Sequence, residues 1–540
     1  MVKEFRKSMI SFSTRPLWMQ VVIVLCGLTA ALPVRSWAQE AAQPSERLTK
    51  VQKDGAATIY AFNYPTVNAA GEKIVLSSAL VAWIPDDRKA TDSIESIHVY
   101  NHATIGSDKE TPSREDSKEL TLVRKMATRT YKNMFDPTSP AADYVGRCII
   151  IAPDYEGYGV TKHLPHPYLA QRLTAQQVLD AFNYGLDLYR KQAAEKSADF
   201  PLLPIKSDWR TFFFGYSQGA AVTLALQRMV EEKGLAEQMH FYGSICGDGP
   251  YDLIETLRYY IEDNGESYNA KTDHRKGISN YPIVVPLIVR GMCMTHPELA
   301  KYKVEDFLSQ QLLDTSVFKW IDSKEHDTSY MSKLWYDQLI AGLDTLGRHY
   351  SPEQMAEMFT SPKKDKVWGR LEKMFTPATY AYLSDTEKMA TVPAEATNAQ
   401  QALHRALADN QVVTGWEPKH RIQFYHSRGD MVVPFGNYEV FQKTHAAGEK
   451  TIYRVNDTYA DSDHIDAAGI FFLELCMSQA FAANFNWICE GLTPTGINVL
   501  RPADIQSHSG NWFTLDGRRL GSKPTTKGVY IHNNKKVVIK

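Results

Sequence analysis

Residues 210–226 read RTFFFGYSQGAAVTLAL, a stretch that joins a strand pattern to a helix pattern. The apolar run from Arg210 to Phe214 is typical of a buried strand, and the run that begins at Ala220 is typical of a helix. Between them lies Gly215-Tyr216-Ser217-Gln218-Gly219, a G-x-S-x-G pattern. A strand that turns this sharply into a helix leaves no room for side chains beside the serine, and glycine relieves that crowding. The pattern predicts that Ser217 is a nucleophile held at the end of a strand.

Short apolar runs alternate with amphipathic stretches on both sides of this motif. Strands are expected over 94–100, 147–152, 210–214, 239–245, 421–425 and 450–455, and helices over 175–191, 220–232 and 470–485. This alternation predicts a mostly parallel sheet covered by helices on both faces. Two β-rich runs, 57–67 and 73–85, flank a glycine-containing turn and predict an antiparallel hairpin. The expected fold class is therefore α/β with a mixed, mostly parallel sheet.

The N-terminus has the pattern of an export signal. Lys3, Arg6 and Lys7 precede an apolar stretch over 17–34, which is followed by Ser36-Trp37-Ala38. A basic region, an apolar region and a small-x-small cleavage site are typical of a signal peptide. We expect residues 1–38 to be removed on export, which places the mature protein outside the cell or on its surface; a retained membrane anchor is the alternative.

The mature chain divides into a core, an insertion and a tail. The strand–helix alternation covers 39–250 and resumes over 418–497, whereas 251–417 is mostly helical in composition. We expect 251–417 to be a helical cap or lid inserted into the core. Within it, residues 283–289 read IVVPLIV; Pro286 argues against an uninterrupted central strand, and the run either belongs to the core or lines an acyl pocket. Residues 505–540 are a tail too short to be stable alone.

A serine hydroxyl becomes a useful nucleophile when an imidazole takes its proton and a carboxylate orients that imidazole. In this architecture the acid and then the histidine follow the serine. Asp430 comes shortly after the expected strand 421–425, and His464 comes shortly after 450–455. Four other carboxylates, Asp457, Asp461, Asp463 and Asp466, compete with Asp430 for the acid role. They are too close in sequence to His464 for an acid on a separate loop, so we predict Asp430.

The oxyanion formed in such a reaction needs backbone N–H donors. One is expected from Gln218, the residue after the nucleophile, at the start of the helix. The second is expected from the loop after strand 94–100, at Ala103 or Thr104, and the sequence leaves that choice open.

Composition and charge exclude several classes of protein. The chain has 540 residues, of which 44% are hydrophobic, and 60 basic residues nearly balance 62 acidic ones. Such a chain can bury a core and carries no basic field for nucleic acid. His163 and His166 are three residues apart, but Pro165 rules out a helical ligand pair and we expect both to be solvated loop residues. Neither a metal motif nor a phosphate-binding glycine loop is present in the sequence, so no cofactor is expected.

Removal of the export signal leaves Cys148, Cys246, Cys293, Cys476 and Cys489. An odd, widely spaced set is not a disulfide framework, although one bridge remains open. Cys148 and Cys246 lie in or beside apolar runs and are expected to be small buried side chains.

The chain resembles the α/β-hydrolase superfamily and, within it, the secretory lipase family. Three stretches carry the likeness: Ala152-Pro153-Asp154-Tyr155-Glu156-Gly157, the turn around Ser217, and Cys246-Gly247-Asp248-Gly249-Pro250-Tyr251-Asp252-Leu253. The resemblance covers about residues 55–495, with a poorly matching insertion. It implies a Ser217, Asp430 and His464 triad, a helical cap, and hydrolysis of carboxylic esters, often lipids.

The tail resembles the C-terminal sorting motifs of secreted bacteroidete proteins, through Leu515-Asp516-Gly517-Arg518-Arg519 and Lys527-Gly528-Val529-Tyr530-Ile531. This resemblance implies a partner in the export machinery. The sequence as a whole therefore predicts a secreted serine esterase or lipase that acts on a small-molecule or lipid ester. A serine peptidase of the same fold and a non-catalytic surface-binding protein are the alternatives.

Overall fold

The computed structural model describes residues 42–124, 147–195, 202–262, 276–341, 350–457, 461–477, 487–490 and several short pieces between 512 and 539. The predicted export signal, residues 1–38, lies outside the described residues. Within those that are described, no helix combines the length and the apolar character that crossing a membrane requires.

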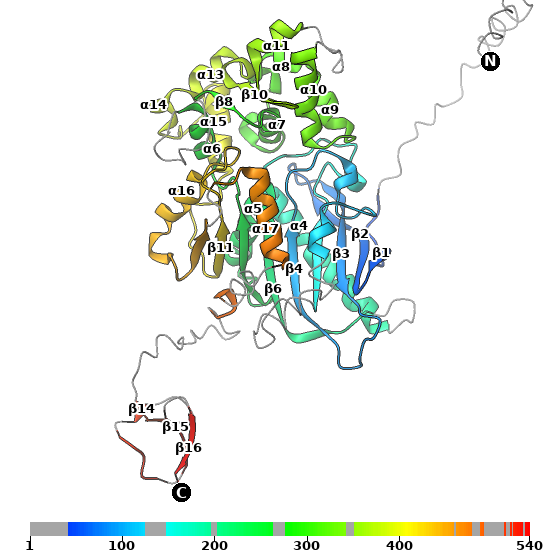
Figure 1. Cartoon of the computed structure of the whole chain (residues 1–540), viewed down its shortest axis with the longest axis vertical. Coiled ribbons are helices and arrows are strands. Elements are labelled where there is room, and N and C mark those ends of the chain that lie inside the picture. Colours follow the sequence, from blue (N-terminus) through cyan, green and yellow to red (C-terminus); the bar gives the residue numbers. More distant parts are fainter. Residues whose placement is uncertain are drawn as a thin grey trace, which may run out of the picture. The chain divides into compact units, whose positions relative to one another are not determined.

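A nine-stranded sheet forms the centre of the core, in the order β1-β2-β3-β5-β4-β6-β7-β11-β12 (Figure 1). The β1–β2, β2–β3 and β3–β5 pairings are antiparallel, and β5, β4, β6, β7, β11 and β12 run parallel to one another. The strands are β1 (Thr49–Asp54), β2 (Ala57–Val67), β3 (Lys73–Trp83), β4 (Ile94–Asn101), β5 (Cys148–Pro153), β6 (Ile205–Tyr216), β7 (Phe241–Gly247), β11 (Arg421–Tyr425) and β12 (Tyr453–Asn456). The predicted mixed, mostly parallel sheet is confirmed.

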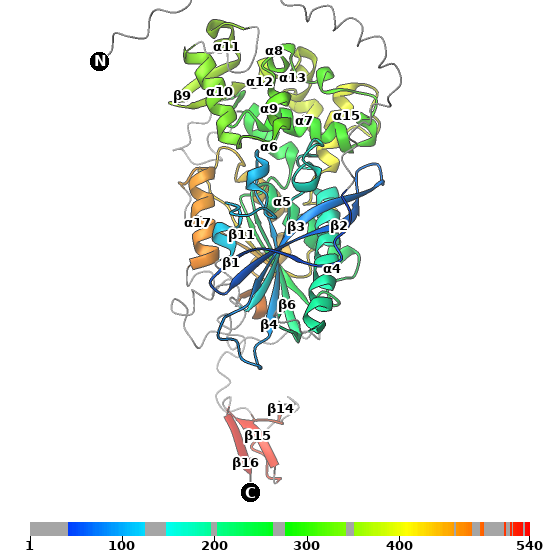
Figure 2. The ribbon, with the colours of Figure 1, turned by 90° about the vertical axis from the view of Figure 1, so that its right-hand side faces the viewer.

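Helices cover both faces of this sheet. Figure 2 shows α4 (Gln171–Glu195) and α17 (His464–Met477) on opposite faces. The core also contains the helices α2 (Leu120–Val123), α5 (Gln218–Glu232) and α16 (Gly436–Thr444). Because both faces are covered, the central strands carry apolar side chains in succession rather than in alternation. In β5 and β7 every residue is buried.

Between β7 and β11 the chain builds a mostly helical cap. Figures 1 and 2 both show its helices gathered at the end of the sheet where the parallel strands finish. Its elements are α6 (Leu253–Ile261), β8 (Ile278–Ser279), α7 (Val284–Thr295), α8 (Gln310–Leu313), α9 (Val317–Ser323), α10 (Thr328–Ala341), α11 (Pro352–Met358), β9 (Phe359–Lys363), β10 (Lys366–Arg370), α12 (Leu371–Met374), α13 (Pro377–Leu383), α14 (Thr386–Met389) and α15 (Ala399–Asp409). The strands β8, β10 and β9 form a small separate sheet.

The cap has an apolar cluster of its own, distinct from the one around the large sheet. Trp335 is fully buried in it and its ring stacks on Phe359 with centroids 4.8 Å apart. The cap also contacts the core closely. Gly291 in α7 lies so near Tyr168 that a Cβ there would be 2.1 Å from the Tyr168 carbonyl oxygen. A glycine is therefore required where this helix meets the core.

The apolar run over 283–289 forms the start of α7, a helix. Pro286 lies in the first turn, where a missing N–H costs nothing because that donor has no intrahelical partner. The helix α17 begins at His464, earlier than the predicted start at 470, and residues 478–485 of that prediction lie outside the described residues. Cys148, Cys246, Cys293 and Cys489 all have free thiols.

The tail contains a four-stranded antiparallel sheet in the order β14-β13-β15-β16. Its strands are β13 (Trp512–Thr514), β14 (Arg519–Leu520), β15 (Gly528–His532) and β16 (Lys535–Ile539). The Trp512 ring stacks on His532 with centroids 4.2 Å apart.

The buried tryptophan gives a test of the cap. We expect Trp335→Ala to lower the free energy of unfolding by about 3–5 kcal/mol, because it removes a large side chain from a closed cluster and leaves a cavity. Urea denaturation followed by circular dichroism measures this loss. Trp320→Ala, at a partly buried position of the cap, is the control and should cost less. A loss below about 1 kcal/mol for Trp335→Ala would contradict the described packing.

Candidate active site

Ser217 lies at the sharp turn between β6 and α5 in a backbone conformation that is rare for a non-glycine residue. Its φ is 54° and its ψ is −122°. Such conformations persist only where the surrounding structure imposes them, and they concentrate at functional sites. The Ser217 N–H donates to the carbonyl of Gly247, at 2.8 Å, which fixes the turn to the end of β7.

The two glycines of the motif allow the close approach that this turn needs. A Cβ on Gly215 would lie 2.4 Å from the Gly219 carbonyl oxygen, and a Cβ on Gly219 would lie 1.9 Å from that of Asn101. Both obstacles are backbone atoms, which cannot swing aside. The side chain of Asn101, at the end of β4, donates to Thr223 Oγ1 in α5 at 2.9 Å. Sheet and helix are therefore tied together on either side of the serine.

The structure brings Ser217, His464 and Asp430 into one hydrogen-bonded chain. The Oγ of Ser217 lies 2.9 Å from His464 Nε2, and His464 Nδ1 lies 2.5 Å from Asp430 Oδ2. With Nδ1–H donating to the carboxylate, Nε2 is free to accept the serine proton. The side chains come from the ends of β6 and β11 and from the first residue of α17. Ser217 is 9% exposed, His464 is 7% exposed and Asp430 is 1% exposed.

The carboxylate of Asp430 is held by its own loop. Its Oδ1 accepts hydrogen bonds from the amides of Val432 and Val433, each at 2.8 Å. The cap reaches the same loop, since the hydroxyl of Tyr260 in α6 lies 2.8 and 2.7 Å from the carbonyl oxygens of Met431 and Val432 and can donate its one proton to either. Backbone donors favour the ionised form of a carboxyl group.

Two of the four competing aspartates, Asp457 and Asp463, are engaged elsewhere. Asp457 pairs with Arg428 at 2.9 Å, and Asp463 caps the start of α17 by accepting from the amides of Ile465 and Asp466, each at 3.0 Å. Asp461 and Asp466 are exposed. The acid that the structure places against His464 is Asp430.

The loop after β4 forms the wall opposite the histidine. The Nδ1–H of His102 donates to the carbonyl of Ala103 at 2.7 Å, which fixes the peptide plane that also carries the Thr104 N–H. Burial lowers the pKa of His102 to about 4, so this ring is neutral. Its ring stacks on that of Tyr155, with centroids 3.9 Å apart. Ala103 and Thr104 both line the cavity in front of Ser217.

His166 is buried, and the prediction that it is a solvated loop residue is wrong; His163 is exposed as expected. His166 Nδ1 donates to the carbonyl of Glu156 at 2.6 Å, and its Nε2 accepts from the side chain of Gln218 at 2.8 Å. Burial lowers the pKa of His166 well below its ordinary value, which keeps the ring neutral and able to accept. This contact anchors the first residue of α5, whose N–H has no intrahelical partner. No sequence signal marks it, because it joins residues 52 positions apart.

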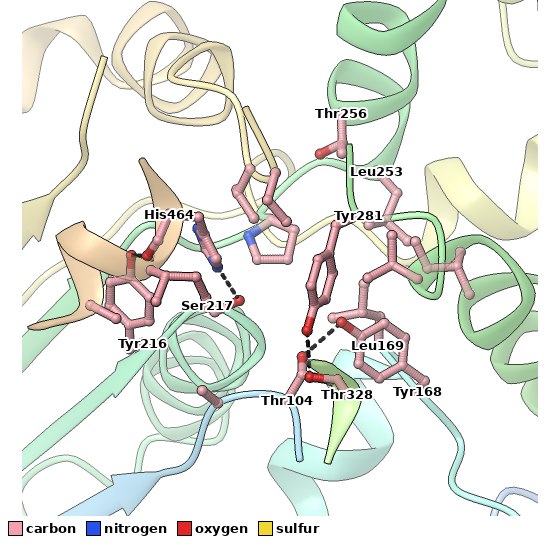
Figure 3. Close-up of a pocket in the computed structure, with 18 residues that line it drawn as sticks. Thr104, Tyr168, Leu169, Tyr216, Ser217, Leu253, Thr256, Tyr281, Thr328 and His464 are labelled. Atoms are coloured by element: carbon pink, nitrogen blue, oxygen red, sulfur yellow. Dashed lines mark hydrogen bonds between the residues drawn. The ribbon is translucent and has the colours of Figure 1, made fainter. Parts of the chain in front are cut away.

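A cavity of about 140 Å³ opens in front of the serine. Figure 3 shows Ser217 and His464 on one side of it and Thr104, Tyr168, Tyr281 and Thr328 on the other. The cap supplies much of its apolar wall, with Leu253 from α6 and Val284 and Ile288 from α7. A second cavity, of about 70 Å³ and almost wholly apolar, lies within the cap and shares Leu253, Thr256, Val284 and Ile288 with the first.

Comparison with known proteins shows a likeness in structure alone. Neither a protein-family model nor a curated protein matches the sequence. The chain is similar to the rice cell wall degrading esterase LipA of Xanthomonas oryzae, with a TM-score of 0.54 and 17% identity over 80% of this chain and 97% of LipA. It is also similar to a protein named as a hydrolase from Legionella pneumophila, with a TM-score of 0.54 and 15% identity over 81% of this chain and 90% of that protein. These likenesses confirm the α/β-hydrolase fold.

The turn around Ser217 can be tested by stability. We expect Gly219→Ala to lower the free energy of unfolding by at least about 2 kcal/mol, because the new methyl group meets a backbone oxygen that cannot move away. Thermal unfolding of the purified variant measures the effect. Gly469→Ala is the control, since a Cβ at this helix position meets nothing within 4 Å. Equal melting temperatures for the two variants would show that the turn is not as tight as described.

Proposed function

We propose that this protein is a serine hydrolase that cleaves carboxylic esters through an acyl-enzyme. The observation that carries the proposal is the hydrogen-bonded chain from Ser217 through His464 to Asp430, facing a cavity with apolar walls. The esterase among the proteins of similar structure agrees with this chemistry.

In the first half of the reaction, His464 Nε2 takes the proton of Ser217 as Oγ attacks the ester carbonyl. Asp430 keeps His464 in the required tautomer and stabilises the imidazolium that forms. The negative charge on the former carbonyl oxygen is met by the Gln218 N–H at the start of α5 and by an N–H of the Ala103–Thr104 loop.

The tetrahedral intermediate collapses when His464 returns the proton to the departing alcohol. A water molecule then enters, gives its proton to His464 and attacks the acyl-enzyme, which releases the acid and restores Ser217. Each step uses the same imidazole, so the geometry at Ser217 and Asp430 has to be retained throughout.

The acyl group of the substrate fits the apolar wall formed by the cap. Val284 and Ile288, from the apolar run at the start of α7, line both the cavity at Ser217 and the second cavity within the cap. An apolar chain that starts at the serine has a continuous wall to follow in this direction. We therefore propose that the substrates are esters with an extended apolar acyl group. The position of Val284 and Ile288 in both cavity walls supports the acyl-pocket interpretation of residues 283–289.

Removal of the nucleophile tests the reaction. We expect Ser217→Ala to lower kcat/KM for p-nitrophenyl esters by at least about 10³-fold, because the remaining groups provide only binding and oxyanion stabilisation. The rate of ester hydrolysis, followed at about 400 nm where the nitrophenolate product absorbs, gives kcat/KM for each variant and hence this ratio. Ser244→Ala is the matched control, because Ser244 is fully buried in β7 away from the proposed chemistry. Unchanged hydrolysis by Ser217→Ala would rule out the proposed nucleophile.

Acyl-chain preference tests the role of the cap. We expect Ile288→Trp to lower kcat/KM for long-chain p-nitrophenyl esters by about tenfold or more, while short-chain esters are much less affected, because the larger ring obstructs the apolar wall. Ile340→Trp is the control, since Ile340 is 58% exposed on the cap. If Ile288→Trp reduced activity equally for all chain lengths, the acyl group would have to bind elsewhere.

A further inference from the structure

A second aspartate, Asp248, lies beside the proposed catalytic acid. It directly follows β7, and Asp430 follows β11, the neighbouring parallel strand, whose last residue Tyr425 pairs with Gly247. A carboxyl oxygen of Asp248 lies within 4.8 Å of one of Asp430. The two side chains are 0% and 1% exposed. Two carboxyl groups are therefore buried together at the ends of adjacent strands.

The hydrogen bonds of the two groups differ. Asp430 accepts from two backbone amides and from His464, as described above. Asp248 Oδ1 accepts from the amide of Ser427 at 2.8 Å, and the Asp248 carboxyl group also interacts with the side chains of Tyr216 and Asp430. Its Oδ2 is buried, and no donor among the described residues points at that oxygen. An unpartnered buried oxygen is unfavourable unless it carries a proton that it can donate.

No positive charge compensates the pair in the part of the chain that the structure describes, where neither carboxyl group pairs with a lysine or arginine. His426 Nε2 lies 3.9 Å from Asp248 Oδ1, but it donates to the carbonyl of Val433, and burial lowers the pKa of His426 to about 4. The other titratable groups near Asp248 are Cys246, Tyr216 and Tyr251, with His464 beyond Asp430. None of these supplies a charge that would allow two adjacent carboxylates.

Two like charges this close in a buried site cannot both persist, so one carboxyl group holds a proton. Asp430 is the charged member, because three N–H donors point at it. Burial, reinforced by the charge of Asp430, raises the pKa of Asp248 well above its ordinary value. Geometry and electrostatics thus assign the proton to the same residue.

We propose that Asp248 is neutral at pH 7 and donates its O–H to Asp430, so that the two buried carboxyl groups carry one negative charge between them. This role rests on the proposed function, in which Asp430 orients His464. With two negative charges beside it, the imidazole would be held protonated and could not accept the proton of Ser217. Asp248 is then a positioning residue, which limits the charge of the acid and fixes its orientation.

The protonation state can be tested without measuring activity, with Asp248→Asn. Asparagine reproduces a neutral donor and tolerates the positive φ of this position, which is 42°. In the unfolded wild type Asp248 ionises above about pH 4, whereas in the folded protein it stays protonated, so folding takes up a proton and stability falls as pH rises. The unfolding constant of the wild type, divided by that of Asp248→Asn, should rise about tenfold per pH unit from pH 5 to pH 7.

Urea denaturation of the full chain at several pH values gives this ratio. Asp87→Asn, at an exposed loop position, is the matched control. The unfolding constant of the wild type divided by that of Asp87→Asn should stay nearly constant over the same pH range. A ratio for Asp248→Asn that is constant or falls with pH would show that Asp248 is ionised in the folded protein and would overturn the proposal. Failure of Asp248→Asn to fold would also overturn it, because asparagine supplies the contact that the proposal requires.

Kinetics test the positioning role. Asp248→Asn should keep kcat within about threefold of the wild type, with an unchanged pH–rate profile, since the charge beside His464 is unchanged. Asp248→Gly accepts the same φ but removes the donor, and it should lower kcat by about 10- to 100-fold with little change in KM, because a small displacement of the acid is costly. Equal losses in kcat for the two variants, or an altered pH profile for Asp248→Asn, would contradict the proposal. An inactive wild type would instead reject the proposed function, and the denaturation experiment would still decide the protonation state.

Discussion

The strained backbone at Ser217 governs how the whole site is arranged. A residue with φ of 54° and ψ of −122° keeps that conformation only because β6 is fixed in register between β4 and β7 and because α5 packs directly over the turn. The same register places the loop after β4, the Gly247 carbonyl and the start of α5 around one side chain. Strand pairing in the sheet therefore stabilises the strained backbone of Ser217, and the glycines at 215 and 219 leave the space that the turn needs.

Burial sets the charges around this turn. The rings of His102, His166 and His426 are all buried, and burial lowers the pKa of each, so they act as neutral donors and acceptors that orient a loop, a helix and a strand end. His464 differs from them because it faces both a carboxylate and the cavity. The cap takes part as well, since Tyr260 holds the loop of Asp430 and α7 lines the cavity. A change in the cap is therefore expected to reach the acid as well as the substrate.

Local patterns in the sequence were sufficient for the features that depend on near neighbours. Strand–helix alternation predicted the sheet, the glycine spacing predicted the turn, and the order of the chain led from Ser217 to Asp430 and His464, which the structure brings into contact. Contacts between distant residues were missed where no motif or chain order marks them. His166 meets Gln218 across 52 positions, and Asp248 meets Asp430 only because β7 and β11 are neighbours although the whole cap separates them in sequence. The sequence could not decide whether the run over 283–289 belongs to the core or lines an acyl pocket, because apolar side chains occur in both places.

Covalent labelling by a fluorophosphonate, which reacts with activated serines, tests directly whether Ser217, His464 and Asp430 act together. Peptide mapping by mass spectrometry after incubation of the full chain is expected to find a single adduct, on Ser217. The adduct should form at least about 10³-fold more slowly in His464→Ala, because the proton acceptor is gone. Labelling of a different residue, or a rate that does not depend on His464, would contradict the claim that these side chains act together on one hydroxyl group.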